Sequence, residues 1–122
     1  MITSVTPDYA TVIDSNLSEL EQTLRNMPDT QFAEKELKMI GNIRWLQKRI
    51  VARLADRKDE RGKLLTKYME RLLDNVPETL DEAIQKLLFY NALFWQAGHW
   101  QCGLGRLDLV LYTYYAQDLA NG

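Results

Sequence analysis

The carboxy-terminal third of the sequence is unusually apolar for a small chain. Eight of the twelve aromatic residues fall between Phe89 and Tyr115, and Asn91 is the only strongly polar residue from Leu87 to Trp95. A surface helix has one apolar stripe, whereas a helix that is apolar all round is enclosed on every side. A chain of 122 residues rarely has enough other mass to enclose such a helix. The segment therefore predicts that the chain is part of something larger or pairs with another copy.

Length and composition predict one soluble domain, spanning residues 1–122, with a modest core. The net charge of −2 provides no general attraction to nucleic acid or to a membrane. The single cysteine excludes an internal disulfide and fits a reducing compartment. No basic start followed by an apolar run is present at the amino terminus, and Leu87–Trp95 is shorter than the roughly 20 apolar residues that span a bilayer. We expect a cytoplasmic protein with no nucleic-acid or membrane partner.

The pattern of apolar residues predicts helices and no strands. Apolar residues recur every three or four positions, and nothing alternates with a period of two. We predict an all-α fold of four or five helices, a helical segment of the kind found in larger domains. Gly41 interrupts the longest block and is expected to mark close helix packing. The blocks run from Pro7 to Met27, from Asp29 or Thr30 to Leu54, from Leu64 to about Asn75, from Thr79 or Asp81 to about Ala97, and, as helix or irregular structure, from Leu107 to Tyr115.

Two stretches of sequence keep a specific order and spacing. They are VPETLDEAIQKLLF, which begins at Val76, and GLGRLDLVLYTYYAQDL, which begins at Gly103. Together they resemble the substrate-domain signature of the glycyl radical enzymes, in the pyruvate formate-lyase-like branch that includes polyol dehydratases and related lyases. The upstream helices, including Ile43–Arg49, are also similar to this family. The resemblance covers nearly all of this chain and a modest part of a much longer enzyme.

The resemblance implies hydrogen abstraction from a small polyol, carboxylate or amine by a thiyl radical under anaerobic conditions. Family members hold a radical on a glycine in an Arg-Val-x-Gly-Tyr-like loop and relay it to a cysteine in a Cys-x-Glu-like motif. Neither motif occurs in these 122 residues. We therefore expect no catalytic residue and no cofactor in this chain. A small-molecule substrate is expected to bind only in the complete enzyme.

By resemblance, Gly103, Arg106 and Asp108 belong to the loop beside the substrate pocket. The family often has serine at the position of Gly103, glutamine at that of Leu109 and proline at that of Thr113. Because of these departures, the resemblance does not indicate which substrate is bound. Arg106 and Asp108 are two residues apart, which on a helix points them to different sides, so each is expected to pair with a group elsewhere. The alternative to a role in the pocket is an ion pair that pins the last helix.

Other patterns that could carry chemistry are better explained as structure. Cys102 could be an activated thiol with Arg106 nearby, but a small buried side chain is the favoured interpretation. His99 and Cys102 have the spacing of two zinc ligands, whereas a structural zinc site needs about four, so no metal site is predicted. Gly103-Leu104-Gly105 lacks the preceding strand and the third glycine of a dinucleotide loop and predicts a tight turn.

The run Arg44–Arg71 carries ten Lys or Arg residues against four Asp or Glu residues. Arg49, Arg53 and Arg57 recur every four residues and form a positive stripe. Nucleic acid or an acidic partner could bind such a stripe. A solvated helix face is the favoured interpretation.

Six aromatic side chains are expected to lie in the core or in an interface, where large side chains with a polar tip are common. They are Phe94, Trp95, Trp100, Tyr112, Tyr114 and Tyr115.

The sequence leaves two possible functions. The chain is either the helical part of a glycyl radical enzyme or a self-standing interaction module whose interface, with another copy or a partner, is Leu87–Tyr115.

Overall fold

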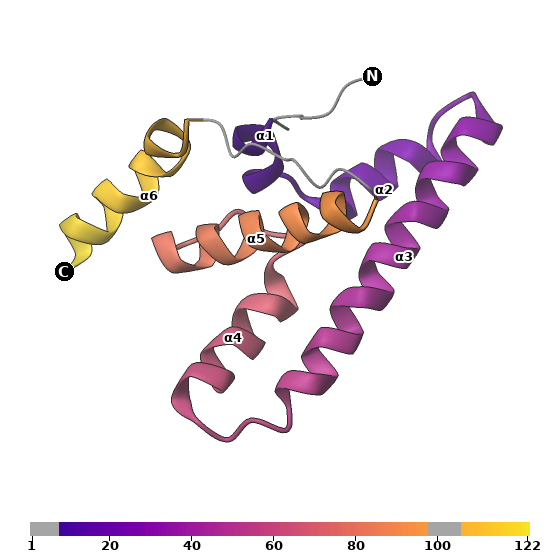
Figure 1. Ribbon diagram of the computed structural model, residues 1–122. Coiled ribbons are helices and arrows are strands. Elements are labelled where there is room, and N and C mark those ends of the chain that lie inside the picture. Colours follow the sequence, from indigo (N-terminus) through magenta and orange to yellow (C-terminus); the bar gives the residue numbers. More distant parts are fainter. Residues whose placement is uncertain (1–7, 98–105) are drawn as a thin grey trace. The chain divides into compact units, whose positions relative to one another are not determined.

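A computed structural model describes residues 8–97 and 106–122, and all regular structure in these ranges is helical (Figure 1). The all-α prediction is confirmed. The described residues form six helices, of which five have seven or more residues. In chain order they are α1 (Tyr9–Ile13), α2 (Leu17–Arg25), α3 (Thr30–Leu54), α4 (Glu60–Arg71), α5 (Leu80–Gln96) and α6 (Leu107–Asn121).

Short-range hydrogen bonds fix where four of these helices begin. In each case a side-chain oxygen just before the helix accepts a hydrogen bond from a backbone N–H of the first turn, which has no partner inside the helix. Of the two starting residues that the sequence offered for each helix, Asp29 and not Thr30 caps α3, and Thr79 and not Asp81 caps α5. The four pairs are Asp8 with Thr11, Asn16 with Glu19, Asp29 with Phe32, and Thr79 with Glu82.

The first predicted helix is two helices in the structure. Asp14, Ser15 and Asn16 interrupt it, because short polar side chains compete for backbone hydrogen bonds and favour caps over helix interiors. Asn16 caps α2, and the N–H of Leu17 donates to the carbonyl of Leu73, 2.8 Å away. The interruption ends α1 after five residues.

The chain divides into two compact units, and each is described by itself. The first unit comprises Met1–Ser15 and Val76–Gly122, and the second comprises Asn16–Asn75. The single domain expected for residues 1–122 stays a prediction.

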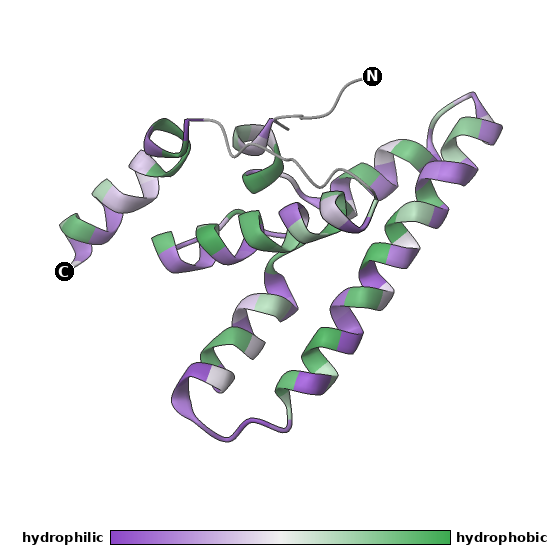
Figure 2. Cartoon of the chain, viewed as in Figure 1, coloured by the Kyte–Doolittle hydropathy of each residue, from purple (hydrophilic) through white to green (hydrophobic). Residues whose placement is uncertain are grey.

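In the second unit, α2 and α4 both pack against α3. Figure 2 shows hydrophilic and hydrophobic residues alternating along α3, as expected of a helix with one covered side. Leu24, Ala33 and Ile40 are buried, and the buried carboxamide of Gln47 donates to the carbonyl of Met69. A polar side chain inside this unit thus has a hydrogen-bond acceptor, as burial requires.

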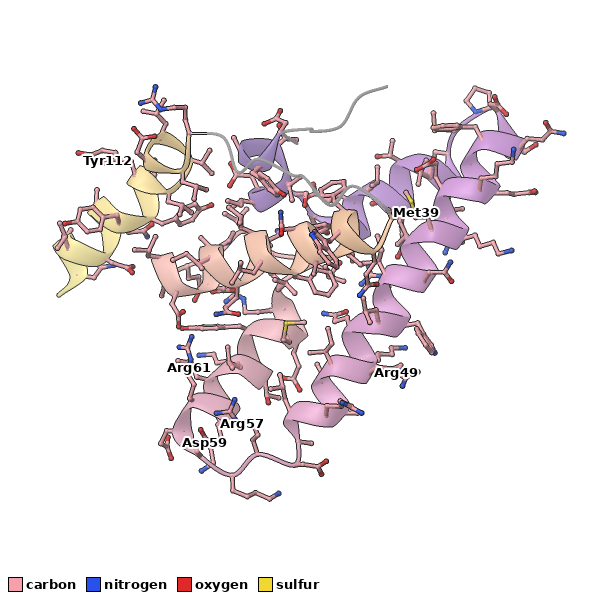
Figure 3. All side chains as sticks on the ribbon, in the orientation of Figure 1. Met39, Arg49, Arg57, Asp59, Arg61 and Tyr112 are labelled. Carbon is pink, nitrogen blue, oxygen red and sulfur yellow. The ribbon has the colours of Figure 1, made fainter. Side chains whose placement is uncertain are left out.

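The two glycines of the second unit have opposite surroundings. The hypothesis that Gly41 marks close helix packing is wrong, because a Cβ atom at Gly41 would have no neighbouring atom within 4 Å. At Gly62, inside α4, a Cβ atom would lie 2.6 Å from Cβ of Arg57 and 2.8 Å from Oδ1 of Asp59. Arg57 and Asp59 form an ion pair of 2.6 Å at the connection between α3 and α4 (Figure 3). Gly62, and not Gly41, is the position where a side chain has no room.

In the first unit, α5 packs against both α1 and α6. Its core is the buried cluster Tyr9, Ile13, Ala83, Leu87 and Tyr114, which partly buried apolar residues of α1, α5 and α6 surround. The fully buried ammonium of Lys86 donates to the carbonyl of Ser15, 2.6 Å away.

Helix α5 is not enclosed on every side by the described residues. Leu88 and Trp95 are 50% and 56% exposed. An apolar face of this helix is therefore open in the single chain. Among residues 8–97 and 106–122, no helix combines the length and the apolar character needed to cross a bilayer.

Candidate functional site

Helix α6 carries most of the described residues that the sequence singles out, and two hollows of the first unit open along it. The larger hollow has a volume of about 570 Å³ and is lined by residues of α1, of the segment 76–78 and of α6. The smaller one has a volume of about 300 Å³ and is lined by residues of α5 and α6. Different faces of α6 line the two hollows, because Leu109, Thr113 and Gln117 border one, whereas Asp108, Tyr112 and Tyr115 border the other.

Tyr114 and Asp14 form the best-defined polar contact of the larger hollow. The Tyr114 hydroxyl donates to Oδ1 of Asp14 at 2.7 Å, and the tyrosine is 8% exposed. Burial, reinforced by the neighbouring Asp14 carboxylate, raises the pKa of the Tyr114 hydroxyl well above its usual value. The hydroxyl therefore stays protonated and remains a hydrogen-bond donor at any physiological pH.

The chemical character of the larger hollow follows from its lining. Asp14 and Glu78 supply carboxyl groups, Thr113 and Gln117 supply neutral polar groups, and its described lining residues include no Lys, Arg or His. Side chains of α1 and α6, together with Val76 and Pro77, form the rest of the wall. Such a lining favours a neutral or positively charged polar group over an anion.

The smaller hollow is mainly apolar. Leu80, Ile84 and Leu111 line it, and Asp108 is the only charged residue of its described lining. Helix α6 is held there by Asp118, whose Oδ2 accepts a hydrogen bond of 2.9 Å from the N–H of Leu80. This bond joins the start of α5 to the last turns of α6.

Arg106 and Asp108 pair with each other, so the expectation that each pairs with a group elsewhere is wrong. Nε and Nη2 of Arg106 lie 2.9 and 2.7 Å from the two carboxylate oxygens of Asp108. The helical-spacing argument fails because Arg106 is the cap residue with φ −85° and ψ 77°, outside α6. The hydrogen bonds from Arg106 lower the pKa of Asp108. Both side chains are mostly exposed, at 72% and 64%.

The predicted aromatic set divides between core and surface. Phe94 packs against the core cluster and meets the ring of Tyr9 edge to face, with ring centroids 6.4 Å apart. Tyr114 is buried, whereas Trp95, Tyr112 and Tyr115 are 56%, 64% and 50% exposed. The remaining predicted site residues, Gly103 and Trp100, lie outside the described residues, as do His99 and Cys102.

Asp14 and Glu78 were not among the residues that the sequence indicated. Asp14 is 100 positions away from Tyr114 in the chain, and no local pattern connects them. Glu78 belongs to the stretch that carries the resemblance, but its place on the hollow follows only from the fold. Among the described residues, no group of three or more His, Cys, Asp or Glu side chains is placed to hold a metal ion.

The fold defines a helical protein with two hollows along α6, and the match to a family gives the class of protein. A family model described as pyruvate formate lyase-like matches residues 13–122, from the last residue of α1 through α6. The chain belongs to the pyruvate formate lyase-like family. No curated protein and no solved structure matches it.

Proposed function

We propose that this chain forms the helical part of a pyruvate formate lyase-like glycyl radical enzyme, a lyase of anaerobic metabolism in the cytoplasm, and that it is inactive alone. The observation that carries the proposal is the family match over residues 13–122. Inactivity is supported by the sequence, because Cys102 is the only cysteine and Leu104, not glutamate, is the second residue after it. A thiyl radical of this family would need a Cys-x-Glu-like motif and a radical glycine from another segment.

The open surface of α6 and α5 supports a place inside a larger assembly. Large exposed apolar patches mark protein interaction sites, whereas single exposed apolar residues are common on any surface. We propose that the remainder of the enzyme, or a second copy, covers this surface. The exposed large apolar residues of α5 and α6 are Leu88, Trp95, Leu109, Tyr112, Tyr115 and Leu119, with exposed fractions between 50% and 66%.

The exposed Arg106–Asp108 pair supports the view that any substrate pocket is incomplete in this chain. By resemblance the two residues order the loop beside the pocket, together with Gly103. Both side chains are about two-thirds exposed here, whereas small-molecule sites bury most of their ligand. We propose that a small-molecule substrate binds only when a further segment forms the opposite wall.

The gene on both sides of the coding sequence provides the first test. We expect a Cys-x-Glu-like motif and a glycine-radical loop to follow in the same or a shifted frame. If no reading frame near the gene encodes either motif, the enzyme proposal is refuted.

Electron paramagnetic resonance tests inactivity separately. The purified chain, treated anaerobically with a glycyl-radical-activating enzyme, the co-substrate from which that enzyme generates the hydrogen-abstracting radical, and a reductant, is expected to give no glycyl radical signal. A radical signal from this chain would contradict the proposed inactivity while leaving the family assignment intact.

The exposed surface also favours a second function, a self-standing interaction module. We expect such a module to form a defined oligomer in sedimentation experiments, and Tyr112→Ser with Leu119→Ser to dissociate it. Gln117→Ser, an exposed polar position on the same helix, is the matched control. A monomer that binds hydrophobic dyes and aggregates would instead agree with an enzyme segment that lacks its covering parts.

A further inference from the structure

Helix α3 carries a line of exposed side chains that the proposed function does not use. Spaced three or four residues apart, they lie on one side of the helix and include four cations and one tryptophan. We call this line the cationic stripe. Its residues are Lys35, Lys38, Asn42, Trp45, Arg49 and Arg53, all exposed.

The positive charge of the cationic stripe is only partly balanced on α3 itself, where Glu34 and Glu36 flank Lys35. Between Leu37 and Leu54, α3 contains no Asp or Glu residue. Within the described part of the chain, no ion pair involves any of the four cations of the stripe. The nearest acidic residues of α3 are Glu34 and Glu36, near its first turn.

Neighbouring cations, in contrast, are used internally. Arg44 faces the unit and binds Glu21 and Asp74. Arg57, which the sequence pattern places in the same stripe, pairs with Asp59 at 2.6 Å. The structure thus separates cations that stabilise the unit from cations that point away from it. Figure 3 shows Arg49 on the side of α3 opposite α4.

Trp45 gives the stripe an apolar centre. It is 59% exposed, and the guanidinium of Arg49 lies 4.8 Å from its ring centroid. This cation–π contact holds Arg49 along the helix surface and reduces the conformational freedom that it would lose on binding. One turn before Trp45, the space around Gly41 is open. A partner helix can therefore approach the backbone of α3 beside the indole ring.

We propose that the cationic stripe binds an acidic amphipathic helix of a partner polypeptide. Glu or Asp side chains at matching positions along the partner helix would face Lys38, Arg49 and Arg53, and an apolar side chain would pack on Trp45. The four cations lie within a stretch of 19 residues, and about 27 Å of helix separates the first from the last. Charges spaced by helical turns on both surfaces match each other without rearrangement of α3.

Nucleic acid and membrane fit these observations less well. A duplex site typically neutralises about 6–10 phosphates, whereas the stripe has four cations on a chain with a net charge of −2. A membrane-surface helix needs a broad apolar face beside its cations. The exposed large apolar residues of α3 are only Phe32, Met39 and Trp45, and of these Trp45 alone belongs to the stripe. An acidic helix needs only one line of complementary charge.

The test uses the full chain and two synthetic helical peptides. One peptide has Glu residues at three- and four-residue spacing around a central Leu, and the other has Gln in place of Glu. Affinity is measured by fluorescence anisotropy, and the Trp45 indole N–H resonance, assigned with Trp45→Phe, reports the position of binding. We expect the Glu peptide to bind and to shift this resonance, and the Gln peptide to do neither.

Matched charge reversals separate the stripe from charge in general. Arg53→Glu is expected to weaken binding of the Glu peptide at least about tenfold. Lys67→Glu, the same change of charge at an exposed position of α4, is expected to change it less than about twofold. Because both positions are exposed, both variants should keep the circular dichroism spectrum of the parent chain.

Three results would overturn the proposal. The first is no binding of the Glu peptide at about 1 mM, the range of the weakest specific contacts. The second is an equal loss of affinity in Arg53→Glu and Lys67→Glu. The third is a tighter interaction at Trp45 with single-stranded RNA or phosphatidylserine vesicles than with the peptide, which would assign the stripe to a different class of partner.

Discussion

The carboxylate of Asp74 accepts four hydrogen bonds within the second unit, and its removal tests how that unit is held together. Oδ1 accepts from the N–H and the hydroxyl of Ser18, at 3.0 and 2.8 Å, and from Nη2 of Arg44 at 2.9 Å. Oδ2 accepts from Nη1 of Arg44 at 3.0 Å. Asp74 thus joins the first turn of α2, the middle of α3 and the segment after α4.

The expected cost of Asp74→Ala follows from these contacts. A hydrogen bond to a charged group contributes about 1.5–3 kcal/mol when it is well shielded from water. The side chains of Asp74 and Arg44 are 30% and 25% exposed, which weakens each contact. We therefore expect a loss of about 2–4 kcal/mol in the free energy of unfolding, and about half of that for Asp74→Asn, which keeps an acceptor for Ser18.

Urea unfolding of the full chain measures this loss. Trp45 is the only tryptophan of the second unit, so its fluorescence in a Trp95→Phe, Trp100→Phe background reports on that unit, and far-ultraviolet circular dichroism reports on all helices. Glu21→Gln is the control, because Glu21 accepts one hydrogen bond from Arg44, at 2.6 Å. It should cost less than about 1 kcal/mol. A loss below about 0.5 kcal/mol for Asp74→Ala, or an equal loss for Glu21→Gln, would refute the reasoning.

The same contacts predict a dependence on pH. Hydrogen bonds from Arg44 and Ser18 lower the pKa of Asp74 below its ordinary value of 3.8. A carboxyl group with a lowered pKa in the folded state stabilises the fold above that ordinary value, and its contribution is lost as the pH falls towards the folded-state pKa. The difference in stability between the parent chain and Asp74→Asn should therefore be constant near neutral pH and shrink below about pH 4. A difference that grows on acidification would contradict this sign.

Three further predictions concern single positions, each measured by thermal or urea unfolding. Gly41→Ala should raise the free energy of unfolding by about 0.5–1 kcal/mol, because its Cβ atom meets open space and alanine favours the helix. Gly62→Ala should lower the free energy of unfolding by about 1–3 kcal/mol, because its Cβ atom would lie 2.6 Å from Cβ of Arg57. Equal effects of the two glycine substitutions would contradict both arguments. Tyr114→Phe should cost about 0.5–1.5 kcal/mol through the lost hydrogen bond to Asp14, and an unchanged stability would show that this bond is not formed in solution.

Features with a local cause could be predicted from the sequence. Asp29 and Thr79 act on backbone groups three residues away, so the chain itself brings donor and acceptor together. Periodicity placed α3 because a helix of 25 residues repeats its apolar pattern many times. Short α1 was missed because one and a half turns contain too few repeats to distinguish it from α2.

Contacts between distant residues could not be predicted. Arg44 and Asp74 are 30 positions apart, and Tyr114 and Asp14 are 100 apart. Arg44 and Asp74 could each have paired with many other charged residues, because long side chains reach several partners at a similar cost in free energy. The error at Arg106 has a different origin, since the argument assumed a helix at a residue that precedes α6. One residue at a helix boundary decided whether Arg106 and Asp108 could meet.

The energetics of α6 connect its fold to its proposed place in a larger assembly. Burial of a large apolar side chain contributes about 1.5–3 kcal/mol, and Leu109, Tyr112, Tyr115 and Leu119 are each at least half exposed. Covering the exposed half of all four would therefore add about 3–6 kcal/mol, which is a large share of the about 5–15 kcal/mol that stabilises a whole domain. Only Tyr114 of this helix is buried, so α6 should be the least protected long helix in amide hydrogen exchange of the isolated chain. Adding the covering segment or a second copy should raise amide protection selectively in α6, which would identify the surface that completes the fold. If α6 is protected as strongly as α3 in the isolated chain, the helix needs no partner.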